Sequence, residues 1–184
     1  MHENKKFIMT EKKYNTIFSA ISIFVLLFTL AVYMMNIGFC LVDGNSMNPT
    51  MENGDAAMIT VKGPESVGYD DIVVLFPLDE NSACIRNGFD FFKRSHIDKQ
   101  IIFIKRVIGL PGDVIEIRDG YAWRNGEKLE CPYTNGLTNG EFGPYLVEEG
   151  KIFCLGDNRD YSADSRSFGA FPMSGVVGKV LFYI

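Results

Sequence analysis

A short segment in the first third of the chain carries a serine that could act as a nucleophile. Residues 44–51 read Gly-Asn-Ser-Met-Asn-Pro-Thr-Met, so Ser46 stands among residues that favour turns, and Pro49 restricts the backbone beside it. In such a turn a hydroxyl more often bonds nearby backbone. Ser46 therefore becomes a candidate nucleophile only if the chain also supplies a base to remove its proton.

The chain offers one histidine and one lysine as candidate bases. His96 lies in a polar stretch, and a Ser-His-Asp triad would depend on it alone. Lys105 stands in the apolar run Ile101–Ile108, where strand alternation places it on one face with Phe103 and Val107. A strand lysine usually reaches the surface, but on an apolar face it is desolvated, which lowers its pKa toward the range where a neutral amine accepts a proton. Lys105 is the better candidate.

A third polar cluster follows the apolar segment Ile152–Leu155. Residues 156–166 read Gly-Asp-Asn-Arg-Asp-Tyr-Ser-Ala-Asp-Ser-Arg. This density of Asp, Arg and Ser can build a hydrogen-bonded loop that holds neighbouring groups in place, and a solvated turn is the plain alternative. Its length and order favour the first interpretation. Arg106 points to the opposite face from Lys105, and we expect it to be a structural ion-pair partner.

The candidate residues follow a long uncharged run, Ile17 to Cys40. As a helix these 24 residues would measure about 36 Å, against about 30 Å for the hydrocarbon core of a bilayer. A removable signal peptide has a shorter apolar region and a small-x-small cleavage site, and this run shows neither. The sequence therefore predicts a retained transmembrane helix over residues 16–38. Four lysines in the basic tail, residues 1–15, place that tail in the cytoplasm.

Beyond the anchor, short alternating segments broken by Gly, Pro, Asn and Asp predict an extracytoplasmic all-β domain over residues 39–184. Asn125-Gly126 predicts a further hairpin. A small cap or insertion is expected within about 79–100 and 112–150. The expected strands are Phe39–Asp43, Ala56–Val61, Asp71–Phe76, Ile101–Ile108, Val114–Arg118, Tyr121–Arg124, Lys151–Leu155 and Val176–Tyr183.

Composition excludes some classes of function. After residue 15 the chain has 14 basic and 21 acidic residues, a net charge of −7, which argues against a nucleic-acid partner. The cysteines show no CxxC spacing and the chain has two histidines, so neither a zinc site nor another cofactor is expected. Disulfide bridges and free thiols both remain open for Cys40, Cys84, Cys131 and Cys154.

Taken together, the three clusters resemble those of the bacterial type I signal peptidases, membrane-anchored serine peptidases that remove signal peptides from exported proteins. The matching segments are Ser46-Met47-x-Pro49-Thr50, Lys105-Arg106-Val107-Ile108-Gly109-x-Pro111-Gly112-Asp113 and Gly156-Asp157-Asn158-Arg159-x-x-Ser162-x-Asp164-Ser165-Arg166. They occur in the family's order behind one N-terminal span, and the resemblance covers essentially the whole chain. Lys105 in place of the histidine of eukaryotic and archaeal-like relatives, with no long insertions, resembles the compact Gram-positive form.

The resemblance implies a role for each site residue. Ser46 would attack the scissile carbonyl, and Lys105 would act as general base. Ser162 would hydrogen-bond and orient the lysine amine, while Asp164 and Arg166 would form a supporting ion pair.

The resemblance also implies an oxyanion hole and a substrate class. The Ser46 N–H would be one oxyanion donor, and Gly44 occupies the position where some members carry a serine that supplies the second, so a backbone amide or a water must replace it. Substrates would be preproteins with small residues at −1 and −3, bound in shallow apolar pockets beside an edge strand. Candidate pocket residues are Leu41, Val42, Ile102, Ile104 and Val107.

These features imply a single-pass protein of a bacterial plasma membrane, with its catalytic domain outside and with preproteins and the lipid bilayer as partners. The oligomeric state is left open. One alternative is a non-catalytic relative that assists assembly of surface proteins such as pilins, although such a role places no demand on the Ser46 and Lys105 pair. A self-cleaving Ser-Lys repressor is a third reading, which the anchor and the acidic domain oppose.

Overall fold

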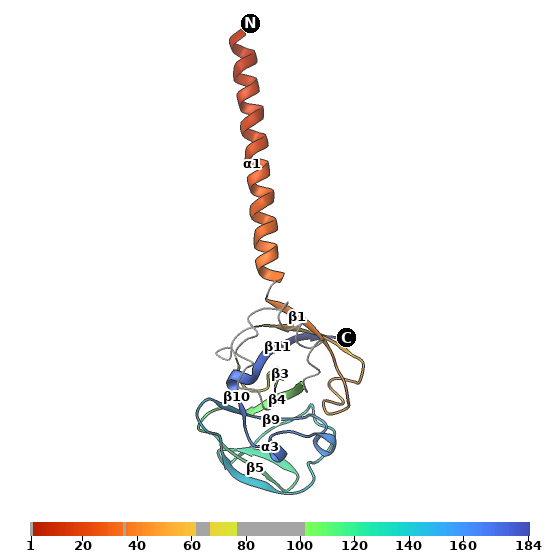
Figure 1. Ribbon diagram of the computed structural model, residues 1–184. Coiled ribbons are helices and arrows are strands. Elements are labelled where there is room, and N and C mark those ends of the chain that lie inside the picture. Colours follow the sequence, from red (N-terminus) through yellow and green to blue (C-terminus); the bar gives the residue numbers. More distant parts are fainter. Residues whose placement is uncertain (1, 35, 62–66, 77–101) are drawn as a thin grey trace. The chain divides into compact units, whose positions relative to one another are not determined.

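The computed structural model describes residues 2–34, 36–61, 67–76 and 102–184. The chain divides into two compact units, residues 1–35 and 36–184. The first is helix α1 (His2–Met34) (Figure 1), whose segment Lys13–Ala31, with mean hydropathy 1.8, is long and apolar enough to cross a membrane. The predicted helix end at residue 38 is wrong. The helix stops at Met34 because the chain from Ile37 onward is paired in a sheet.

The second unit is mostly β, as expected, and is built around a seven-stranded sheet whose neighbouring strands are antiparallel. Its order is β1-β2-β11-β3-β4-β9-β10. The C-terminal end of β11 therefore lies beside β2, one strand away from β1 (Figure 1). The strand bounds are β1 (Ile37–Leu41), β2 (Ala56–Thr60), β3 (Ile72–Leu75), β4 (Phe103–Gly109), β9 (Lys151–Leu155), β10 (Phe171–Pro172) and β11 (Val176–Tyr183).

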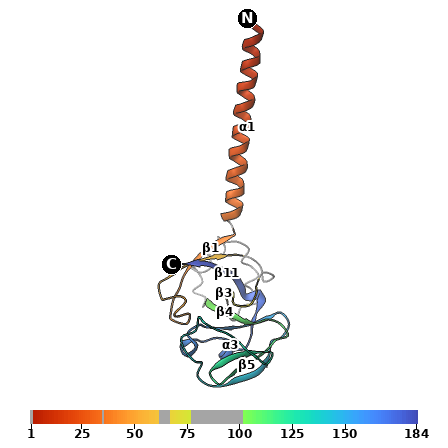
Figure 2. The same cartoon turned by 180° about the vertical axis from the view of Figure 1, so that it is seen from behind.

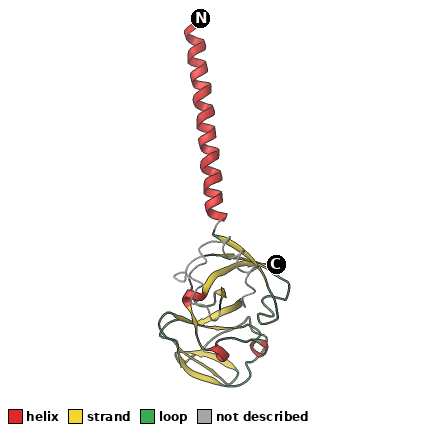
Figure 3. Cartoon of the chain, viewed as in Figure 1, coloured by secondary structure: helices red, strands yellow, loops and turns green. Residues whose placement is uncertain are grey.

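A smaller four-stranded sheet, in the order β7-β6-β5-β8, occupies the region where a cap was expected. It lies beyond β4 and β9, on the side of the main sheet away from β1, in both views (Figures 1 and 2). Short helical turns η3 (Arg159–Tyr161), α3 (Ser165–Phe168) and η4 (Met173–Gly175) interrupt the strands and loops (Figure 3). The strands of this sheet are β5 (Val114–Arg118), β6 (Tyr121–Arg124), β7 (Glu127–Lys128) and β8 (Phe142–Leu146).

An apolar core joins the two sheets. Phe153 and Leu155 of β9 and Ile108 of β4 pack against the inward-facing Ile115 and Ile117 of β5, and all five are at most 2% exposed. The alternation of buried and partly exposed residues along β5 is that of a strand with one face on the core. This core fixes β4, which carries Lys105, and β9, which leads into the third polar cluster.

The expected strands are confirmed, with shifts at their ends, and the Asn125-Gly126 hairpin joins β6 to β7. Two strands were missed, β8 and the two-residue β10. The expected insertion at 79–100 lies outside the described residues, as does Cys84. Of the described cysteines, Cys40, Cys131 and Cys154 are free thiols, so no bridge forms among them.

Gly178 of β11 lies against the backbone of β2 with no room for a side chain. A Cβ at this position would collide with the carbonyl oxygen of Thr60 in β2. We expect Gly178→Ala to push β2 and β11 apart and to lower the free energy of unfolding by about 2 kcal/mol or more, measured by chemical denaturation. Gly68→Ala is the matched control, because a Cβ there meets only an ordinary contact at 3.6 Å. Equal losses in the two variants would contradict the prediction.

Candidate functional site

Ser46 lies in the loop between β1 and β2, and two methionines fix that loop. The Met51 N–H donates to the Met47 carbonyl (3.0 Å), which forms a single turn. Both methionine side chains are at most 1% exposed and pack against Val42 and Ala57. The residue after Ser46 is therefore anchored in the core, so the position of Ser46 is set by packing as well as by hydrogen bonds.

Lys105 projects from β4 to the Ser46 hydroxyl. Its Nζ lies 2.7 Å from Ser46 Oγ and donates to the Ile104 carbonyl at 2.9 Å. The Phe103 ring lies 5.1 Å from the amine. The lysine is 4% exposed, so it does not reach the surface as an arbitrary strand lysine would. The structure thus brings together the two residues expected to carry the chemistry.

Burial lowers the pKa of Lys105 from 10.5 to about 8. The negative charges of Asp164 and Asp157 act in the opposite direction and favour the protonated amine, but more weakly than burial. Near neutral pH an appreciable fraction of the amine is therefore uncharged. An uncharged amine at 2.7 Å from a hydroxyl can accept its proton.

A buried ion pair joins the lysine's strand to the serine's loop. Arg106 donates through Nε and Nη2 to both carboxylate oxygens of Asp157, at 2.8 and 2.6 Å. The same carboxylate accepts a hydrogen bond of 2.6 Å from Thr50 Oγ1. Next to it, the Asn158 N–H donates to the Ser46 carbonyl at 3.0 Å. Asp157 and Asn158 thereby hold the serine loop against β4.

Tyr133, from the loop after β7, covers the other side of this ion pair. The Arg106 guanidinium lies 3.8 Å from the centre of the Tyr133 ring, and the Tyr133 hydroxyl donates to Asp70 Oδ1 at 2.7 Å. Arg106 Nη1 donates to the Asp70 carbonyl at 2.9 Å. Burial by itself lowers the pKa of Arg106, but the hydrogen bond and charge of Asp157, together with the neighbouring Tyr133 and Asp70, raise it overall. The guanidinium is thus permanently charged and enclosed.

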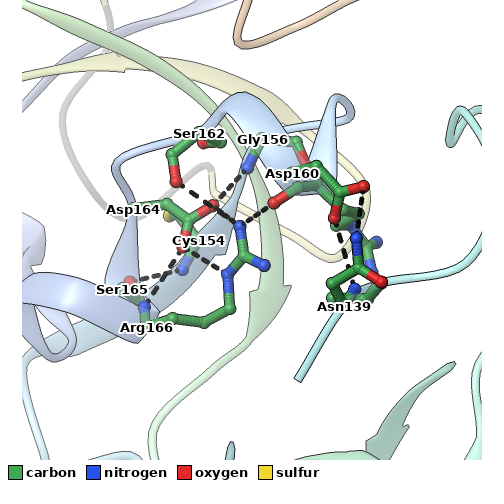
Figure 4. Close-up of polar contacts among 10 residues, drawn as sticks. Asn139, Cys154, Gly156, Asp160, Ser162, Asp164, Ser165 and Arg166 are labelled. Atoms are coloured by element: carbon green, nitrogen blue, oxygen red, sulfur yellow. Dashed lines mark hydrogen bonds and ion pairs between the residues drawn. The ribbon is translucent and has the colours of Figure 1, made fainter. Parts of the chain in front are cut away.

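Asp164 and Arg166 form the ion pair expected of them (Figure 4). Arg166 donates to the two carboxylate oxygens of Asp164 through Nε and Nη2, both at 2.9 Å. Asp164 is fully buried and also accepts from the Gly156 N–H at 3.0 Å. A Cβ on Gly156 would collide with the Ser46 carbonyl oxygen and with Ser162 Oγ. The ion pair therefore positions the backbone on which Ser46 rests.

One expectation for the site needs correction. The Ser162 hydroxyl is buried and makes no hydrogen bond within the described part of the chain, so the expected bond to Lys105 does not form. The amine instead uses Ser46 and the Ile104 carbonyl. Ser162 still adjoins Ser46, since both meet the same side of Gly156. Gly44 has a φ of +99°, and its N–H donates to Asn53 Oδ1 at 2.8 Å, so that amide is already used.

Sequence reasoning named Arg106 as an ion-pair partner without finding its carboxylate, and it assigned no role to Thr50, Asn158 or Tyr133. The available signal was two charged residues, Arg106 next to Lys105 and Asp157 within the third cluster. His96 lies outside the described residues. In the described ranges no group of three or more His, Cys, Asp or Glu side chains could hold a metal ion.

Comparison with known proteins adds an independent finding. The model of the family described as signal peptidase, peptidase S26, matches residues 14–184. Signal peptidase I of Bacillus licheniformis is 31% identical over 188 aligned residues, which cover 94% of this chain and 90% of that protein. Signal peptidase IB of Staphylococcus aureus (strain COL) is 30% identical and covers 77% of this chain and 74% of its own. A crystal structure of a signal peptidase I from Enterococcus faecalis V583 aligns with 64% of this chain and 97% of its own, at 30% identity and a TM-score of 0.45.

Two carboxylates with equally close cationic partners allow the buried ion pair to be weighed. Asp157→Ala leaves Arg106 buried and unpaired, and we expect a loss of about 3–5 kcal/mol in the free energy of unfolding. Glu148→Ala removes the partner of Lys151, at the same N–O distance of 2.6 Å but on the surface, and should cost less than about 1 kcal/mol. Denaturant titration of both variants measures the difference. Similar losses in the free energy of unfolding would show that the buried Arg106–Asp157 ion pair matters no more for stability than a surface ion pair.

Proposed function

This chain belongs to the signal peptidase family, peptidase S26, and we propose that it cleaves signal peptides from exported preproteins with a Ser46–Lys105 dyad. The observation that carries the proposal is the 2.7 Å contact between the Ser46 hydroxyl and a buried lysine of lowered pKa. A peptidase of this type needs no metal and no histidine, because the neutral amine replaces the imidazole of a triad.

In the proposed reaction, uncharged Lys105 accepts the Ser46 proton as Oγ attacks the scissile carbonyl. The protonated amine then gives this proton to the departing amine of the mature protein, which leaves an ester on Ser46. A water, deprotonated in turn by Lys105, hydrolyses the ester. Arg106, Asp157, Asp164 and Arg166 act indirectly, by holding the serine loop and the backbone behind it.

The tetrahedral intermediate needs hydrogen-bond donors for its oxygen. The Ser46 N–H is a suitable first donor, since no acceptor takes it within the described residues. Gly44 supplies neither a hydroxyl nor a free N–H, because Asn53 accepts from it. The second donor is left to another backbone amide or to a water.

A substrate strand has a place to pair beside the dyad. The peptide groups of Val107 face β3, where they bond Asp70 and Asp71. Because the peptide groups of successive strand residues point alternately to either side, the N–H and C=O of Ile104 point away from β3, to the side of β4 on which β9 lies. β9 pairs with β4 only from Arg106 onward, so Ile104 faces no strand in the described ranges. An extended peptide added there would place its backbone next to Lys105 and Ser46.

We propose substrates with small residues at −1 and −3, accommodated in apolar pockets along this edge. Ile102 and Ile104 are partly buried and can line such pockets, and Leu41 is exposed. Val107, also a candidate from the sequence, is fully buried in the core formed with Val73 and Cys154, so it cannot contact a substrate.

The membrane assignment is part of the proposal. Helix α1 would anchor the chain with its basic N-terminal residues in the cytoplasm. The catalytic unit adds an apolar surface of its own, because Phe39 and Phe182 both lie opposite Met58 in the sheet and are 60% and 56% exposed. Leu41 and Ile184, in the next row, are 73% and 75% exposed. Such a row of exposed apolar residues suits a lipid surface.

Removal of either member of the dyad tests the proposal. We expect Ser46→Ala and Lys105→Met each to lower kcat for cleavage of a purified preprotein by at least about 10³-fold, because each removes a partner of the proton transfer. Cleavage is measured with the full-length protein in detergent or vesicles. Ser174→Ala, an exposed serine in η4, is the control and should keep normal activity.

A second readout separates loss of chemistry from loss of fold. In the folded protein the pKa of Lys105 lies below its value in the unfolded chain, so the charged lysine destabilises the folded state. This destabilisation is fully present below about pH 8 and disappears as the pH rises toward 10.5. Lys105→Met should therefore be more stable than the wild type near pH 6, on the order of 2 kcal/mol. A wild-type protein that cleaves no preprotein would favour the non-catalytic assembly role, whereas a fully active Ser46→Ala variant would contradict Ser46 as the nucleophile.

The rate should depend on pH through the lysine. Because only the neutral amine accepts the serine proton, kcat/KM should rise about tenfold per pH unit below the pKa of about 8 and level off above it. The measurement is a pH profile between about pH 6 and about pH 10, controlled by circular dichroism at each pH. A profile flat over this range would contradict the assignment of Lys105 as the base.

A further inference from the structure

A pocket of about 160 Å³ lies on the side of the small sheet, outside the dyad. We call it the Arg159 pocket. Its walls come from the β5–β6 turn, the chain after β7 and the third polar cluster, and they include Tyr121, Lys128, Thr134, Thr138 and Arg159. None of these residues takes part in the proposed cleavage. The pocket is too small for a folded partner or a nucleotide, and large enough for an ion of a few heavy atoms.

Arg159 is the unusual member of this pocket. It is 3% exposed, and its Nε and Nη1 donate to the Gly156 carbonyl and to Thr138 Oγ1, both at 3.2 Å. Its Nη2 has no hydrogen-bond partner, and no carboxylate pairs with this guanidinium within the described part of the chain. Arg106 and Arg166, by contrast, each hold a carboxylate in two hydrogen bonds.

A guanidinium that is buried without a counter-ion is costly, and an unpaired buried N–H adds to the cost. Arginine guanidinium groups are always charged in proteins. The arginine therefore cannot relieve this cost by becoming neutral, as a buried lysine does. An anion that enters the pocket and accepts from Nη2 would relieve it.

The remaining wall residues favour an anion. The Lys128 amine lies 3.1 Å from the centre of the Tyr121 ring and adds a second positive charge. The Thr138 hydroxyl accepts from Arg159 and can still donate its own hydrogen, whereas the Thr134 hydroxyl already donates to the Cys131 carbonyl at 2.9 Å. Glu130 is the one acidic lining residue, and it is exposed. Arg159 also borders a larger pocket of about 400 Å³, but Glu141 and Asp160 line that one, and their carboxylates would repel an anion.

We propose that the Arg159 pocket binds a small tetrahedral oxyanion, of the size and charge of inorganic phosphate. The oxygens accept hydrogen bonds from Arg159 Nη2 and from the Thr138 hydroxyl, and Lys128 balances the second charge. Binding would stabilise the loop after β7 against the third cluster. Arg159 also bonds Gly156, which touches Ser46, so an occupied pocket stiffens the backbone behind the nucleophile.

Thermal unfolding of the full-length protein with added inorganic phosphate tests the proposal, and it requires no cleavage assay. At constant ionic strength set with sodium chloride, Tm should rise by about 3 °C and saturate in the low millimolar range. A general salt effect would instead grow steadily with concentration. Sulfate should act as phosphate does, and chloride should not.

Variants locate the effect. Arg159→Met should fold, since an apolar side chain removes a buried charge, and should lose the phosphate response. If that variant does not fold, Lys128→Met serves, and it should weaken the response at least about threefold in apparent affinity. Lys151→Met removes a partly exposed lysine on β9, outside the pocket, and should respond as the wild type does. An equal loss in the two lysine variants, or no saturable response in the wild type, would overturn the proposal.

Discussion

The ion pair between Arg106 and Asp157 is the contact on which the arrangement of the site depends. Arg106 neighbours Lys105 on β4, and Asp157 neighbours Asn158, whose N–H holds the Ser46 carbonyl. This bidentate ion pair therefore sets the distance between β4 and the C-terminal end of β9. Because Thr50 donates to the same carboxylate, the ion pair also fixes the position of the serine loop. Because both charges are buried, neither partner can be removed without leaving the other in an apolar environment. The pair is a weak source of net stability and a strong source of geometric precision.

The same burial has opposite consequences for the two neighbouring cations of β4. Arg106 keeps its charge, because two hydrogen bonds to Asp157 and the Tyr133 ring replace water. Lys105 has only neutral acceptors, Ser46 Oγ and the Ile104 carbonyl, so desolvation lowers its pKa. Strand alternation places these two side chains on opposite faces. Two adjacent residues of β4 thus differ in charge because they lie on opposite faces of the strand: Arg106 is paired and charged, and Lys105 is partly neutral and reactive.

Much of this organisation could be predicted from the sequence. The strands with regular alternation, such as Val114–Arg118, were found because one face of each packs on the core. β8 was missed because Gly143 and Pro144 interrupt its pattern, and both are tolerated there since β8 is the edge of its sheet and its register shifts against β5. The helix end was placed too late because Ile37 and Gly38 are as apolar as a membrane segment, and only their pairing with β2 identifies them as a strand.

For the site, residue types were predictable and individual contacts were not. The spacing of Ser46, Lys105 and the third cluster indicated which segments meet, but the orientation of a hydroxyl such as Ser162 depends on atoms of Gly156 and Ser46 that no pattern encodes. Likewise, the sequence indicated ion pairs for Arg106 and Arg166, but neither the carboxylate that Arg106 reaches nor the burial of Arg159 without one. Tertiary packing, which decides which acid each cation reaches, supplied this distinction.

The Ile104 carbonyl connects the base with the proposed substrate edge. It accepts from Lys105 Nζ at 2.9 Å, and its peptide group faces the side where β9 no longer pairs. A substrate strand that adds there would bring its own N–H to the same carbonyl and would exclude water from the amine. Both changes disfavour the charged lysine, because one of its two acceptors becomes shared and its solvation decreases further. Substrate binding and formation of the neutral base would then be coupled through one backbone oxygen, so that Lys105 is most reactive when a peptide is in place.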